Sequence, residues 1–100
     1  MAQGYAVFKI PEGKLLKVKL TYEAEDTIIE AVQLLGDFFV HPEDGIEAVE
    51  QALRGVRLEE AAISEAVTAC VAERSIDLLG ITAAGIAHTI LMAAGMREAN

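Results

Sequence analysis

The chain has 100 residues with 16 acids against 8 lysines and arginines, which gives a formal net charge of −8. Such a surface repels a phosphate backbone over most of its area, which argues against nucleic-acid binding. This length supports one hydrophobic core, and we expect a single domain over residues 1–100. No apolar run is long enough to span a bilayer and no signal peptide is visible, which predicts a cytoplasmic protein with no membrane association.

The first predicted elements are strands, because apolar residues recur with period two. Residues 5–10 form the first strand, and the turn Pro11-Glu12-Gly13 predicts a hairpin in which glycine adopts a positive φ. Residues 14–22 form the second strand, with one buried and one solvated face. All four lysines of the chain lie in this hairpin: Lys9, Lys14, Lys17 and Lys19. Their clustering indicates either a solvated strand face or a docking site for an acidic partner.

A third strand is predicted for residues 27–35. Its inward positions change parity between Ile29 and Val32, which predicts a β-bulge near Glu30-Ala31 or burial on both faces. Three such strands joined by short turns form an antiparallel meander. In the segment 34–42 that follows, the strand period gives way to a helical period.

Two helices are predicted next. The first has Pro42 at its first position, where the missing N–H is tolerated, and Gly55 as the C′ residue that closes it. The second covers residues 58–74 and carries alanines that let a neighbouring helix approach closely. Residues 75–80 are predicted as a short extended connection.

The last predicted helix covers residues 83–94, with Thr82 as its N-cap. It is apolar nearly all round, so it requires cover on two sides. Residues 96–100 are expected to be a frayed tail. Together the elements predict an α+β fold in the order βββααα, a small antiparallel three-stranded sheet followed by three helices packed on one of its faces.

Residues that could support catalysis are few: His41, His88, Cys70, Asp37, and the hydroxyls of Ser64, Ser75, Thr68, Thr82 and Thr89. A nucleophile requires a base within hydrogen-bond distance and a third group that orients the base. Cys70 and His88 fall on different predicted helices, so a dyad is geometrically open, although Cys70 has the pattern of a buried core residue. The histidines and cysteine match no zinc spacing, and no glycine-rich phosphate loop is present. We therefore expect no catalysis, metal or cofactor on this chain.

Four segments together carry a family signal. Glu12-Gly13-Lys14-Leu15-Leu16 opens a strand, and Leu34-Leu35-Gly36-Asp37-Phe38-Phe39 ends another. Pro42-Glu43 opens a helix that ends at Ala52-Leu53-Arg54-Gly55, and Leu79-Gly80-Ile81-Thr82 opens the last helix. In this order and spacing they resemble the C-terminal accessory domain of lipoate-protein ligases, over about residues 5–94. In that family a glycine pair commonly precedes the lysine, whereas Glu12-Gly13 stands here.

The resemblance implies a function. The chain would make no bonds itself but would dock on a ligase catalytic subunit, which binds lipoate, ATP and Mg²⁺ and forms lipoyl-adenylate. That subunit then modifies a lysine of a lipoyl acceptor domain, so the chain serves acceptors only indirectly. Since the sequence starts at Met1 and spans only this domain, we expect the separate accessory subunit of a two-protein ligase. The resemblance places the expected docking surface at the signature positions Gly13, Lys14, Gly36, Asp37, Phe38 and Phe39.

Two interpretations of the Phe38-Phe39 pair remain open. In the first, Asp37 bonds local amides in a turn while a phenylalanine fills the core. In the second, one phenylalanine enters the core and the other is presented to a partner. An alternative for the whole chain is a homodimeric α+β module that self-associates through the apolar last helix and has no ligase role.

Overall fold

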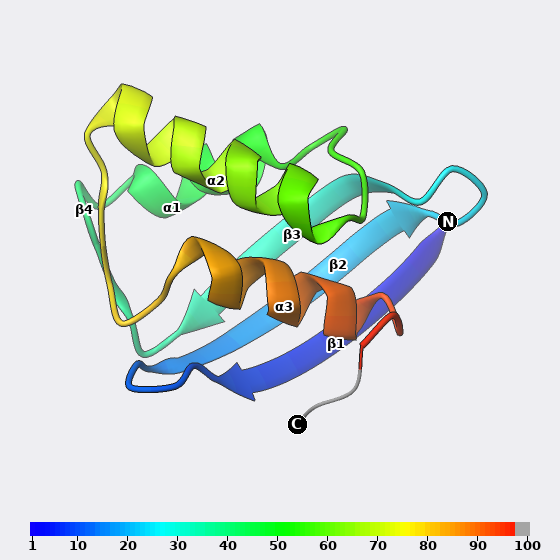
Figure 1. The fold of residues 1–100 in the computed structure, drawn as a ribbon, viewed down its shortest axis with the longest axis horizontal. Helices are drawn as coiled ribbons and strands as arrows, with labels where there is room; N and C mark the ends of the chain where they lie inside the picture. The colour runs from blue at the N-terminus through cyan, green and yellow to red at the C-terminus, as the bar shows by residue number, and fades with distance from the viewer. Residues whose placement is uncertain (98–100) are drawn as a thin grey trace.

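The computed structural model describes residues 1–97 and contains a three-stranded antiparallel sheet with helices on one face (Figure 1). The strands are β1 (Ala2–Lys9), β2 (Leu15–Glu23) and β3 (Ile28–Gly36), and they lie in the order β1-β2-β3. The helices are α1 (Gly45–Ala52), α2 (Glu60–Arg74) and α3 (Ala83–Ala93). The predicted α+β fold with a meander followed by three helices is therefore confirmed.

The parity change in the third strand is a β-bulge. Thr21 pairs with Ala31 but Tyr22 pairs with Ile29, so Glu30 is the extra residue, at the predicted place. Because one residue is inserted, Ile29 and Val32 both face the core, with exposed fractions of 1% and 8%.

The outer edge of β3 is covered by α1 and the segment that follows it. The Glu50 carboxylate accepts a hydrogen bond from the Leu34 amide at 2.7 Å, and the Gly55 amide donates to the Ile29 carbonyl at 2.7 Å. Gly55 has the positive φ expected of a helix terminator, +85°, but it was predicted as the C′ residue and lies one residue further on, because the C-cap of α1 is Leu53. This cover satisfies backbone groups that an open sheet edge would expose.

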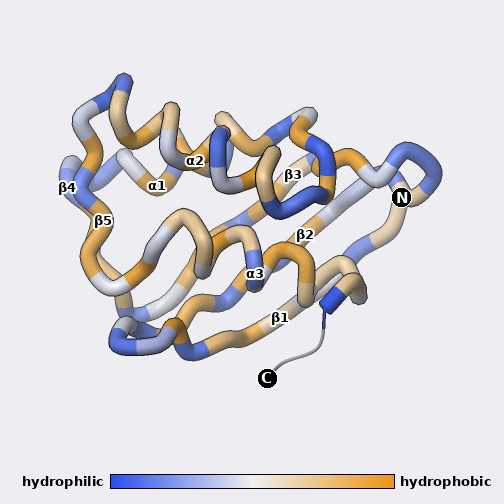
Figure 2. Tube along the Cα trace, viewed as in Figure 1, coloured by the Kyte–Doolittle hydropathy of each residue, from blue (hydrophilic) through white to orange (hydrophobic). Residues whose placement is uncertain are grey.

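Helix α3 lies against β1 and β2 and beside α2, which gives it cover on two sides as predicted (Figures 1 and 2). Thr82 caps it, because the Thr82 Oγ1 accepts from the Gly85 amide at 2.9 Å. Ile86 and Ile90 have no exposed surface. The apolar surface proposed for homodimer formation is therefore buried within the chain itself.

A second, two-stranded sheet was not predicted. It consists of β4 (Phe39–His41) and β5 (Asp77–Leu79), which run antiparallel. The extended connection expected at residues 75–80 therefore exists, and its partner is the segment between β3 and α1. Val40 and Leu78, which oppose each other, are half-buried against the core.

Two local predictions are wrong, one about the start of a helix and one about a turn. Helix α1 begins at Gly45 and not at Pro42. Pro42 lies in a turn before the helix, in which the Pro42 carbonyl accepts from the Gly45 amide at 2.8 Å. In the β1–β2 hairpin the positive φ, 59°, falls on Glu12 and not on Gly13. Glycine is required at position 13 for a different reason, the close approach of the Gly80 carbonyl oxygen.

The predicted frayed tail is wrong for Met96 and Arg97, and its last residues, 98–100, lie outside the described part. The Met96 amide donates to the Leu91 carbonyl at 2.9 Å. The Arg97 guanidinium forms a 2.8 Å ion pair with Glu60 and donates to the His88 Nδ1 at 3.1 Å. Within residues 1–97, no helix has the length and apolar character needed to traverse a bilayer.

Candidate functional site

The predicted signature residues meet at one end of the larger sheet. Gly13 and Lys14 lie in the β1–β2 hairpin, and Gly36 to Phe39 connect β3 to β4. The Asp37 amide donates to the Leu15 carbonyl at 3.3 Å, which joins the two segments. We call this place the hairpin corner and define it as Gly13, Lys14, Gly36, Asp37, Phe38, Phe39, Leu79 and Gly80.

Gly80, which precedes α3, contributes a third segment to the hairpin corner. Its carbonyl accepts from the Lys14 amide at 2.8 Å. A Cβ on Gly13 would lie 2.5 Å from this same carbonyl oxygen, and a Cβ on Gly80 would lie 2.5 Å from the Lys14 Cγ. The two chain segments therefore approach so closely that side chains at positions 13 and 80 would displace them.

Gly36 has the same function on the other side of the corner. Its φ is +152°, and a Cβ there would overlap the Leu15 carbonyl oxygen and lie 3.2 Å from the Phe38 ring. Glycine is thus required both for the backbone conformation and for the approach of β2. The close approach of the Leu15 carbonyl is therefore the steric reason for a glycine at the end of β3.

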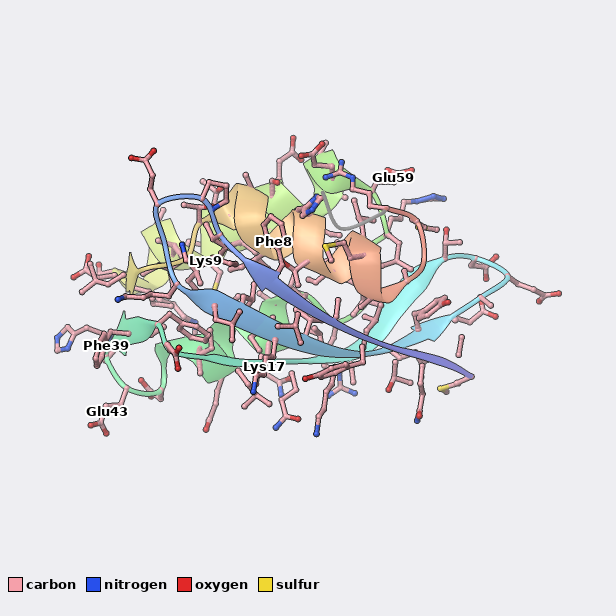
Figure 3. All side chains as sticks on the ribbon, turned by 90° about the horizontal axis from the view of Figure 1, so that it is seen from below. Phe8, Lys9, Lys17, Phe39, Glu43 and Glu59 are labelled. Atoms are coloured by element: carbon pink, nitrogen blue, oxygen red, sulfur yellow. The ribbon has the colours of Figure 1, made fainter. Side chains whose placement is uncertain are left out.

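The two adjacent phenylalanines point in opposite directions. Phe38 is half-buried and packs against the core, whereas Phe39 is 70% exposed. Phe39 pairs across the small sheet with Leu79, which is 59% exposed, and Figure 3 shows Phe39 directed away from the body at one end of the molecule. This arrangement matches the interpretation in which one ring enters the core and the other is presented to solvent.

The polar signature residues are exposed and make few contacts. Asp37 is exposed, and within residues 1–97 its carboxylate has no hydrogen-bond partner, so the turn-stabilising role proposed for it is not seen. The Lys14 side chain is exposed as well, with its stem against Gly80. Both side chains are therefore free to interact with another molecule.

The residues considered for catalysis do not come together. Cys70 is buried on α2. His88 on α3 packs against Phe8, with ring centroids 4.5 Å apart, and its Nδ1 accepts from Arg97. Because arginine can only donate, the His88 proton resides on Nε2, which is buried and has no partner among residues 1–97. His88 is thus engaged with Phe8 and Arg97, not with Cys70.

The other histidine and the hydroxyls show no catalytic arrangement either. His41 is exposed on β4, opposite Asp77. Thr82 Oγ1 caps α3, and the fully buried Thr89 donates to the Gly85 carbonyl at 2.7 Å, which are structural roles. Across residues 1–97 no group of three or more histidines, cysteines or acids is placed to hold a metal ion.

The structure brings the six signature residues into one region and adds Leu79 and Gly80, which belonged to the family signal but not to the predicted docking surface. Leu79 is identified only by its pairing with Phe39, and Gly80 by its contact with Lys14. The local sequence offers one weak signal, a glycine directly before the Ile81-Thr82 helix start.

Comparisons with known proteins agree with this geometry. A model of the family described as bacterial lipoate protein ligase C-terminus matches residues 14–90. A solved chain from an archaeal lipoylation system, a bipartite lipoate protein ligase and its E2 lipoyl domain from Thermoplasma acidophilum, superposes with a TM-score of 0.68. The sequence identity is 24%, and the match covers 97% of each chain, so this likeness establishes a shared fold. No curated protein matched the sequence.

Proposed function

The chain belongs to the family of bacterial lipoate protein ligase C-terminal domains, and from this premise we propose that it is a non-catalytic accessory subunit of a two-protein ligase. In this proposal it docks on a separate catalytic subunit and supports the ATP-dependent adenylation of lipoate. The catalytic subunit carries the lipoate, ATP and Mg²⁺ sites and modifies the lipoyl acceptor domains. The buried free Cys70 fits a reducing cytoplasm as the compartment.

The observation that carries the proposal is the construction of the hairpin corner. Three segments far apart in the sequence are held together there by backbone hydrogen bonds and by glycines that leave no room for a Cβ. These contacts position two exposed apolar side chains, Phe39 and Leu79, beside each other at the corner. Large apolar side chains held outward on a well-ordered backbone are typical of protein contact sites.

The bipartite archaeal ligase supports a separate partner for this chain. The matched archaeal chain is covered over 97% of its length, so it is of about the same size as the present one. If the present protein works in the same manner, its contribution is to order or cover the active-site loops of the catalytic subunit. Order of this kind raises the rate by fixing reacting groups and excluding water.

The proposal is tested by reconstitution. The catalytic subunit is assayed for pyrophosphate release with lipoate and ATP, alone and with a stoichiometric amount of this chain. We expect the mixture to react faster than the catalytic subunit alone, and this chain alone to release none. An equal rate with and without the chain contradicts the accessory role, and release by the chain alone contradicts its non-catalytic nature.

A homodimeric module without a ligase role remains the alternative. Sedimentation of the isolated chain measures it directly. Since Ile86, Ile90 and Leu91 of α3 are at most 5% exposed, we expect a monomer in the absence of the catalytic subunit. A tight dimer that does not bind the catalytic subunit would favour the alternative.

A further inference from the structure

The face of the larger sheet opposite the helices is uncovered (Figures 1 and 3). Its centre consists of two cross-strand rows, in which Val7, Lys17 and Leu35 oppose one another, followed by Tyr5, Lys19 and Gln33. Three of these are large apolar side chains that are exposed, 57% for Tyr5, 40% for Val7 and 38% for Leu35. We call these six residues the open sheet face.

The open sheet face differs in charge from the rest of the chain. It holds two lysines and no acid, whereas the whole chain has a net charge of −8. Acids of the same region lie outside these two rows: Asp37 at the hairpin corner, Glu30 in the bulge of β3, and Glu23 at the far end of β2, where its carboxylate accepts from the Asp26 amide. Lys17 projects from this face, away from the helices (Figure 3). The open sheet face is therefore positive and partly apolar on a chain whose net charge is negative.

The surface is also hollowed. A shallow depression of about 620 Å³ lies over the second row and is lined by Tyr5, Lys19 and Gln33 among others. An aromatic ring, an amide and an ammonium group around one depression can receive a protruding polar side chain. A carboxylate suits it best, because Lys19 supplies a charge-assisted hydrogen bond.

A second copy of this chain does not suit the open sheet face. In a two-fold symmetric pair centred on this face, Lys17 and Lys19 of one copy would lie close to Lys17 and Lys19 of the other. Like charges in an interface cost several kcal/mol. An acidic surface of a different protein complements this face better than a second copy of the chain does.

The uncovered side of the sheet is too small for a stable interface by itself, so the docking surface must extend to the hairpin corner. A nine-residue strand spans roughly 30 Å and three strands about 14 Å, so the whole uncovered side of the sheet, with the open sheet face at its centre, offers roughly 400 Å² in projection. A stable interface buries about 800 Å² on each partner. The exposed Phe39 and Leu79, which lie just beyond the end of β3, extend the surface toward that size.

We propose that the open sheet face, continued by Phe39 and Leu79, binds an acidic surface of the ligase catalytic subunit, with Lys17 and Lys19 pairing with its carboxylates. This inference rests on the proposed function and adds which surface docks and what chemistry recognises it. The lysines guide association and fix orientation, and the apolar side chains supply most of the buried area.

The test reverses the two charges. The double variant K17E/K19E is compared with R57E/R74E, which changes the net charge equally but at exposed arginines outside the open sheet face. Affinity for the catalytic subunit is measured by calorimetry. We expect K17E/K19E to weaken binding about tenfold or more and R57E/R74E to change it less than about threefold. Raising the salt from about 50 to about 500 mM should weaken wild-type binding but not that of K17E/K19E.

The outcomes separate this inference from the proposed function. If the wild type binds and accelerates adenylation but K17E/K19E binds equally well, only the inference is wrong. If the wild type does not bind the catalytic subunit, both are wrong. If K17E/K19E binds normally but the reaction with the lipoyl acceptor slows, the face contacts the acceptor, and the inference is again wrong.

A second measurement does not depend on how the variants fold. Carbodiimide joins a lysine amine to a carboxylate that contacts it, and mass spectrometry identifies the joined peptides. In the wild-type complex we expect Lys17 or Lys19 to be linked to acids of the catalytic subunit. Links formed only by Lys9 or Lys14, or only between copies of this chain, would overturn the proposal.

Discussion

Two regions of the molecule, the interface between α3 and the sheet and the hairpin corner, are held together by different interactions. In the first, large apolar side chains such as Ile86 and Ile90 are buried completely, and stability comes from apolar burial. In the second, glycines and backbone hydrogen bonds hold three segments together, and the large side chains Phe39 and Leu79 point outward. The first region therefore stabilises the fold, while the second presents a surface at the expense of leaving apolar area in water.

This difference predicts that substitutions act separately on stability and on binding. The largest effect is expected in the core. Ile90→Ala removes a side chain with no exposed surface, so the cavity and the lost burial should lower the free energy of unfolding by about 2–5 kcal/mol. Urea denaturation measures it, with the exposed Ala84→Ser on the same helix as the control. Equal stability of the two variants would show that α3 contributes little to the core.

The next effect concerns the backbone of the hairpin corner. Gly36→Ala adds a Cβ that overlaps the Leu15 carbonyl oxygen, so we expect a loss of about 2–3 kcal/mol in stability. Gly55→Ala is a matched control, since Gly55 also has a positive φ but no atom within 4 Å of the place that a Cβ would take, and it should cost about 1 kcal/mol. Equal losses would mean that conformation alone, not close approach, requires glycine in the corner.

Phe39→Ser removes an exposed ring of the hairpin corner and should affect binding but not stability. Because the ring is 70% exposed, the free energy of unfolding should change by less than about 0.5 kcal/mol. Binding to the catalytic subunit should weaken about 30-fold, the effect of a hot-spot residue of about 2 kcal/mol. Met96→Ser, at another exposed apolar residue, is the control and should change neither quantity. A marked loss of stability in Phe39→Ser would assign the ring to the fold instead.

The smallest effect is expected where the two regions join. Thr82→Ala removes the hydroxyl that caps α3 two residues after Gly80, so stability should fall by about 1 kcal/mol. Affinity for the catalytic subunit should stay within about twofold, because the cap contributes to α3 and not to the exposed surface. Thr68→Ala on the exposed side of α2 serves as the control. A large loss of affinity would show that the start of α3 belongs to the docking surface.

Much of the core was predictable because each strand and helix carries its own period. Leu16, Val18 and Leu20 alternate with Lys17 and Lys19, and the bulge at Glu30 follows from a parity change inside one strand. The start of α1 was wrong because Pro42 suits a turn as well as a first helical position, and only the bond from the Gly45 amide distinguishes the two.

The candidate site was predictable in part. Signature positions in the hairpin and after β3 were identified from sequence, and the structure brings them together through the bond between Asp37 and Leu15. Leu79 and Gly80 were missed because they join the site through pairing with residues 40 or more positions away. A strand of three residues, such as Phe39–His41, is too short to show a period.

The sequence by itself determined the order of the three long strands and the three helices, the buried faces, the cap at Thr82 and the family, because all of these depend on patterns within short stretches. Only the tertiary structure decided that Phe38 enters the core while Phe39 faces solvent beside Leu79, and that Gly13 must be small because of Gly80. The physical reason is that close approach and exposure are properties of segments distant in sequence, and local periodicity does not encode them.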